Sequence, residues 1–98
     1  MHKEIVYTDH LEFRLKQRNI PHELPKVVLQ NAKEYYFDKM TGYYVAIANV
    51  DYKGRRKEFI VVFEIEDKIV LITIHPIRNE QKVNRIKSGR WIRVEVEL

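Results

Sequence analysis

Three basic side chains recur at a four-residue spacing near the start of the chain: His10, Arg14 and Arg18. Residues four apart lie one turn above another on an α-helix, so a helix over residues 9–19 would place all three in one stripe. Histidine can give or take a proton near neutral pH. The planar guanidinium of arginine can donate two hydrogen bonds to a phosphate. The spacing therefore indicates a site for a phosphate group.

A second set of polar side chains ends an apolar segment, Ile69 to His75. If that segment is a strand, strict alternation puts Ile69, Leu71, Thr73 and His75 on one face. This face would change from apolar to polar at its carboxyl end. If that end lies near the first helix, one cleft would contain the candidate catalytic residues His10, Arg14, Arg18, Thr73 and His75.

Such a set of side chains suits the cleavage of RNA without a metal ion. The attacking 2′-hydroxyl needs a base, the leaving 5′-oxygen needs an acid, and the pentacoordinate phosphorus carries additional negative charge. His10 and His75 are the candidates for the proton transfers, and Arg14 and Arg18 are the candidates for the phosphate. No cofactor is expected, because the chain has no Gly-rich phosphate loop, no HExxH motif and no cysteine for a zinc site.

Each of these residues also has a structural interpretation. His75 could be a histidine whose ring is satisfied locally. Arg14 could form a buried salt bridge to Glu34 or Glu64, because an unpaired buried charge is very costly. Arg18 could stabilise the carboxyl end of its helix. The remaining histidines, at positions 2 and 22, are expected on the surface.

The helix that carries the stripe is amphipathic in an unusual way. Thr8 or Asp9 can cap its start. The half expected to face the protein body comprises Phe13, Gln17, His10, Arg14, Arg18, Leu11 and Leu15, in order round the helix, and Asp9, Glu12, Lys16 and Asn19 fill the opposite half.

The rest of the chain predicts an α+β fold. A short edge strand is expected over Lys3 to Tyr7, and a second helix from between Pro21 and Pro25 to about Asn31. The later elements are strands at Glu34–Phe37, Tyr43–Val50, Lys57–Ile65 and Ile69–His75, a short helix at Asn79–Lys87, and an edge strand at Trp91–Glu97. Short loops between the four middle strands favour antiparallel pairing. We expect one domain over residues 1–98, with the two N-terminal helices packed on a four- to six-stranded antiparallel sheet.

A basic segment near the carboxyl end offers a different function. The chain has a net charge of +4, and residues 78–93 contain six basic side chains against Glu80 alone. This excess favours a polyanionic partner such as RNA. The alternative hypothesis is thus a non-catalytic RNA- or protein-binding module, whose candidate nucleic-acid ligands are Arg78, Lys82, Arg85, Lys87 and Arg90. Five tyrosines of the first hairpin could stack on bases, although half-buried strand positions explain them better: Tyr35, Tyr36, Tyr43, Tyr44 and Tyr52.

Composition bears on the compartment. The absence of cysteine favours a reducing, cytoplasmic environment. No apolar run approaches the roughly 20 residues that cross a bilayer, so no membrane partner is expected. The first ten residues, MHKEIVYTDH, lack the apolar stretch of a secretory signal.

Residues 7 to 76 resemble a widespread prokaryotic family of small domains of unassigned function. The resemblance rests on the opening T-D-H-L-E-F-R-L-K-Q-R-N-I and on a late strand that ends I-T-I-H-P. The family pattern is a histidine, an arginine four residues on, a second arginine closing the helix, an isoleucine beginning the next helix, and a threonine in a late strand. The matching residues are His10, Arg14, Arg18, Ile20 and Thr73.

That family is similar to the RelE/ParE-type toxin and small-RNase fold group. The resemblance implies a RelE/ParE-like fold, a toxin-like endoribonuclease activity, and neutralisation by a partner antitoxin. The chain departs from the ribosome-dependent RelE toxins, which use a tyrosine near the carboxyl end, because no tyrosine follows Tyr52. ParE-type members act on gyrase, so the fold alone does not determine the activity.

Overall fold

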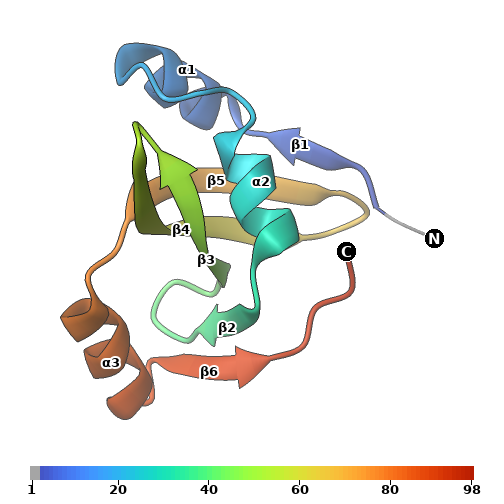
Figure 1. Ribbon diagram of the computed structural model, residues 1–98. Coiled ribbons are helices and arrows are strands. Elements are labelled where there is room, and N and C mark those ends of the chain that lie inside the picture. Colours follow the sequence, from blue (N-terminus) through green and yellow to red (C-terminus); the bar gives the residue numbers. More distant parts are fainter. Residues whose placement is uncertain (1–2) are drawn as a thin grey trace.

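The computed structural model describes residues 3–98, which form three helices and six strands (Figure 1). In chain order the elements are β1 (Ile5–Tyr7), α1 (Asp9–Gln17), α2 (Leu24–Asn31), β2 (Glu34–Asp38), β3 (Tyr44–Tyr52), β4 (Arg55–Ile65), β5 (Ile69–Pro76), α3 (Asn79–Lys87) and β6 (Trp91–Val94). The order of helices and strands agrees with the sequence analysis, and most boundaries differ by one or two residues. The α+β class is confirmed.

All six strands belong to one sheet, in the order β1-β5-β4-β3-β2-β6. The pairs from β2 to β5 are antiparallel, as their short loops require, and β6 pairs antiparallel with β2 at one edge. The expectation of a purely antiparallel sheet is wrong, because β1 pairs with β5 in parallel. No tight turn joins these two strands, so loop length could not fix their relative direction.

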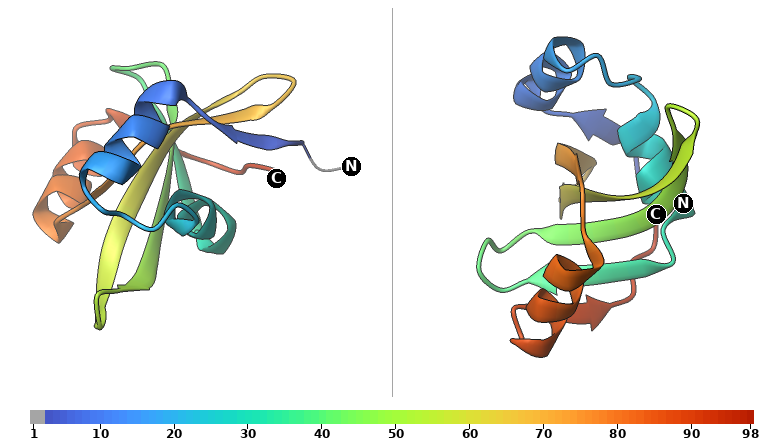
Figure 2. Two further views of the ribbon diagram at one scale, coloured as in Figure 1. Left: turned by 90° about the horizontal axis from the view of Figure 1, so that it is seen from above. Right: turned by 60° about the vertical axis from the view of Figure 1, so that its left-hand side comes forward.

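Both faces of the sheet bury apolar side chains. Under α1 and α2 lies the larger core, which includes Leu11, Leu15, Val28, Leu29 and Phe63. The other face contains a smaller cluster of Tyr36, Val45, Ile47, Ile60, Ile77 and Trp91. Figure 2 shows α3 and β6 at the opposite end of the molecule from α1. No helix within residues 3–98 is long and apolar enough to span a membrane.

The buried face of helix α1 is narrower than the sequence predicted. The Thr8 hydroxyl accepts a hydrogen bond from the Leu11 N–H at 3.1 Å and so caps the helix. Leu11 and Leu15 are buried, but the side chain of Phe13 is 60% exposed. The prediction that Phe13 faces the protein body is therefore wrong. The histidine-arginine stripe lies along the border between the two buried leucines and solvent.

A β-bulge in β5 changes which side chains share a face. Phe63 pairs with Leu71, but Val62 pairs with Thr73, so Ile72 is an extra residue. Ile74 consequently joins Leu71 in the large core. Thr73 and the following His75 lie opposite Val62 and Ile60, on the other face. The strict alternation predicted for this strand is wrong from residue 73 onwards.

Candidate functional site

The five candidate catalytic residues line one cleft. It has a volume of about 370 Å³ and is lined by His10, Leu11, Arg14, Leu15, Arg18, Ile20, Thr73, Ile74 and His75. The cleft forms because β1 pairs only with Ile69–Leu71, after which the chain turns into α1 beside the remaining part of β5. Three larger hollows, of about 570, 750 and 890 Å³, are lined by no histidine. Residues of α1 and of β5 thus line the same cleft, whereas the Thr73 and His75 side chains start from the sheet face opposite the large core.

Arg14 is half-buried, and the side-chain hydrogen bonds that it forms within residues 3–98 go to its own helix. Its Nε donates to Nε2 of His10 at 3.3 Å, and one terminal nitrogen lies 3.4 Å from the side-chain oxygen of Gln17. Within residues 3–98 it forms no ion pair, so the predicted alternative of a salt bridge to Glu34 or Glu64 is wrong. A cation beside a cleft without a carboxylate partner is suited to receive an anionic ligand.

The two histidine rings have different partners. In His10, Nε2 accepts the hydrogen bond from Arg14, so Nε2 is the acceptor nitrogen of this contact. In His75, Nδ1 lies 3.1 Å from the carbonyl oxygen of Pro76, so Nδ1 carries a proton and donates it there. This contact orients the His75 ring, and no hydrogen bond to its Nε2 is found within residues 3–98. The local satisfaction expected of a structural His75 is therefore present, but it involves one nitrogen only.

Arg18 follows the last turn of α1. Its backbone N–H bonds the carbonyl of Arg14 at 2.9 Å and closes the helix. The side chain is exposed, and within the described part of the chain it forms no ion pair. Arg18 can thus complement the negative end of the helix and still reach an anion in the cleft.

Two cations of the basic segment 78–93, Lys82 and Arg90, form internal ion pairs. Lys82, only 17% exposed, lies 2.9 Å from a Glu34 oxygen and 3.4 Å from a Glu58 oxygen. Arg90 binds both carboxylate oxygens of Asp38 at 2.9 Å. Both cations were predicted as RNA ligands. Instead, Lys82 connects α3 to β2 and β4, and Arg90 connects the residue before β6 to the end of β2. Their charges are neutralised locally, which weakens the binding-module hypothesis.

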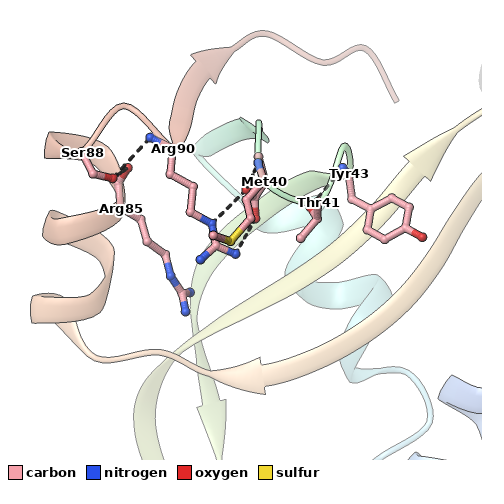
Figure 3. Close-up of polar contacts among 7 residues, drawn as sticks. Met40, Thr41, Tyr43, Arg85, Ser88 and Arg90 are labelled. Carbon is pink, nitrogen blue, oxygen red and sulfur yellow. Dashed lines mark hydrogen bonds and ion pairs between the residues drawn. The ribbon is translucent and has the colours of Figure 1, made fainter.

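The Asp38–Arg90 pair joins the end of β2 to the start of β6. Figure 3 shows Arg90 directed towards the turn that contains Met40. Asp38 is 4% exposed and also accepts from the Met40 N–H at 3.0 Å. Burial opposes the charged form, but the hydrogen bonds from Arg90 and Met40 outweigh it, so the pKa of Asp38 is lowered. This pair was missed in the sequence because 52 residues separate its members.

The other basic side chains near α3 either contact aromatic rings or are exposed to solvent. The Arg85 guanidinium lies 5.2 Å from the centre of the Trp91 ring, and that of Arg93 lies 5.8 Å from the Tyr36 ring. Arg78 and Lys87 are exposed and form no ion pair within residues 3–98. Of the five predicted RNA ligands, Arg78, Arg85 and Lys87 keep a charge that no carboxylate neutralises.

The tyrosines of the first hairpin serve the core. Tyr44 stacks on Phe63 with ring centres 5.7 Å apart, and Tyr35 meets the same ring edge-on at 6.5 Å. The Tyr35 hydroxyl donates to the carbonyl of Leu29 at 2.8 Å. Tyr36 stacks on Trp91 and is buried. The interpretation as half-buried strand residues therefore fits these rings better than base stacking.

One further titratable pair, His22 with Glu12, lies outside the cleft lining. His22 is exposed as expected and lies 2.8 Å from a Glu12 carboxylate oxygen, which raises its pKa. His2 lies outside the described residues. Within residues 3–98 no group of three or more His, Asp or Glu side chains is arranged to hold a metal ion.

Comparison with protein-family models, with curated proteins and with solved structures finds no match for this chain. The RelE/ParE relationship therefore stays a prediction based on the sequence pattern.

Proposed function

We propose that the chain is a toxin-like endoribonuclease that cleaves RNA in the cleft between α1 and β5 without a metal ion. The observation that carries this proposal is the convergence of His10, Arg14, Arg18 and His75 on one cavity. Two proton-transfer groups and two cations, with no carboxylate in the lining, are the side chains that phosphodiester cleavage requires.

The reaction would proceed by attack of the RNA 2′-oxygen on phosphorus. One histidine removes the 2′-hydroxyl proton while the new P–O2′ bond forms. The P–O5′ bond breaks, and the other histidine protonates the leaving 5′-oxygen. Arg14 and Arg18 bind the phosphate oxygens and stabilise the additional charge of the transition state. The products are a 2′,3′-cyclic phosphate and a 5′-hydroxyl, with no change in oxidation state.

The test is cleavage of a mixed-sequence single-stranded RNA by purified protein in the presence of EDTA. We expect cleavage by the wild type and a loss of at least about 100-fold in His10→Ala, because a positioned acid or base contributes roughly 10²–10⁴-fold. Arg14→Ala is expected to lose activity similarly. His22→Ala and Arg55→Ala are matched controls outside the cleft lining, which should retain full activity. Equal loss in the controls, or no loss in His10→Ala, would refute the assignment.

The binding-module alternative makes a different prediction. If residues 78–93 form the functional surface, Arg78→Ala and Lys87→Ala should weaken RNA binding and lower its salt dependence, whereas His10→Ala should change little. Arg78 and Lys87 are the informative variants because neither forms an ion pair that holds the fold together. A partner antitoxin is part of the endoribonuclease proposal through the family resemblance alone.

A further inference from the structure

One backbone N–H of β5 points away from β4, as the hydrogen-bond pattern of the strand shows. In an antiparallel ladder, residues alternate between pairs that exchange hydrogen bonds and pairs whose N–H and C=O point away from each other. The Ile77 N–H donates to the Glu58 carbonyl at 3.1 Å, which identifies that pair as bonded. Counting back along the register, Ile60 and His75 also form a bonded pair, whereas Val61 and Ile74 do not. The N–H of Ile74 therefore points away from β4.

The direction away from β4 is the edge next to α1. In the first part of β5, backbone hydrogen bonds to β1 and its flanking residues occupy this edge. Ile69 donates to the Glu4 carbonyl, and Leu71 accepts from the Thr8 N–H. Beyond Leu71 the strand β1 has ended, and no side chain of residues 3–98 accepts from the Ile74 N–H among the hydrogen bonds found. Ile74 lines the cleft although its side chain is buried in the core. Because its N–H lies in the plane of the sheet and points to this edge, we expect the backbone of Ile74 to be the part that meets the cavity.

Because of the bulge, the Ile74 N–H is the backbone donor that faces this edge of the sheet. Without the extra residue Ile72, the edge-facing positions after Leu71 would be Thr73 and His75. With the bulge they are Ile74 and Pro76, and proline has no N–H. Between residues 73 and 76 the edge therefore offers a single backbone donor, and it opens into the space that Arg14 and Arg18 border.

We infer that the Ile74 N–H is a phosphate-binding donor of the cleft, at the position that stabilises charge developing on a nonbridging oxygen. This inference rests on the proposed phosphodiester substrate. The Ile74 carbonyl faces the same edge, so the peptide alone would not attract an anion. The guanidinium groups of Arg14 and Arg18 supply the attraction, and the N–H fixes where one oxygen lies.

The first test is an NMR titration of the ¹⁵N-labelled protein with a single-stranded RNA hexamer whose 2′-hydroxyls are all methylated, so that it binds without being cleaved. We expect a saturable downfield shift of the Ile74 amide proton that disappears in Arg14→Ala. Saturable shifts of the Arg14 and Arg18 Nε–H signals with an unmoved Ile74 amide would overturn the inference and leave the proposed function standing. No saturable shift anywhere would overturn both.

The second test removes this donor and keeps the side chain. Replacement of Ile74 by its α-hydroxy acid converts the peptide N–H to an ester oxygen and keeps the side chain. We expect hexamer binding to weaken about tenfold or more, because the phosphate loses one hydrogen bond to a charged oxygen. The same replacement at Ile69 is the matched control, since its N–H is already bonded to Glu4. Equal binding by the two folded esters would overturn the inference. Weakened binding by the Ile74 ester, with unmodified RNA left uncleaved by the wild type, would support it while refuting catalysis.

Discussion

Replacement of Arg90 with alanine is expected to destabilise the fold and not merely to remove a surface charge. The substitution deletes both 2.9 Å hydrogen bonds to Asp38, a carboxylate that is 4% exposed. The Met40 N–H and the neighbouring Trp91 side chain would remain to stabilise that charge, without a cation. Asp38 lies where β2 turns towards β3, so the cost falls on the junction of β2 and β6.

The magnitude follows from the burial of the two partners. Removal of one member of a fully buried pair costs roughly 3–5 kcal/mol. Arg90 keeps 29% of its side chain exposed, so water can partly reach the gap left by its removal. We therefore expect a loss of about 2–3 kcal/mol in the free energy of unfolding.

The assay is urea denaturation at neutral pH, with Arg55→Ala as the matched control because that arginine is exposed and forms no ion pair within residues 3–98. The control should change stability by less than about 0.5 kcal/mol. Because the pKa of folded Asp38 is lowered from 3.8, the pair stabilises the fold above that pH, and its contribution is lost as the pH falls through the lower folded value. A loss equal to that of Arg55→Ala, or one independent of pH, would refute the reasoning.

Three further predictions test other parts of the structure. Arg14→Ala should cost less than about 1 kcal/mol in urea denaturation, because the side-chain hydrogen bonds found within residues 3–98 go to α1; a loss above about 3 kcal/mol would show a buried partner. Lys82→Ala should destabilise the fold by about 1–3 kcal/mol, since two carboxylates that share this cation would lose it, and a neutral result would contradict the bridge. The Glu12 contact raises the pKa of His22, so its stabilisation is complete below pH 6.5 and is lost as pH rises through the folded pKa; an NMR titration midpoint at or below 6.5 would contradict this.

Local patterns predicted most of the secondary structure. The i, i+4 spacing of His10 and Arg14, the proline at position 25 and the short polar loops between strands each act over a few residues, and the structure contains the helices and hairpins that they indicate. The face of β5 was mispredicted because a single inserted residue, Ile72, reverses the alternation, and apolar residues on both sides of the bulge gave no sign of it.

Contacts between distant segments could not be predicted in the same way. The parallel pairing of β1 with β5 and the pairing of Arg90 with Asp38 join residues more than 50 positions apart. Phe13 was assigned to the core because it is apolar, but α1 crosses the edge of the sheet and buries only a narrow side. The sequence predicted the cleft only on the condition that the end of β5 lies near α1. The structure meets this condition because β1 ends early, so that α1 lies beside the last part of β5.

The most direct measurement of the central claim compares two RNAs that differ in one atom, each incubated with the wild-type protein and EDTA. The second RNA has a 2′-deoxyribose at the nucleotide whose 3′-phosphate is cleaved in the first. The account predicts cleavage of the first RNA to a 2′,3′-cyclic phosphate and no cleavage at the same position in the second. Cleavage of both RNAs would show that the 2′-hydroxyl is not the nucleophile, and cleavage of neither by folded protein would contradict an endoribonuclease site in this cleft.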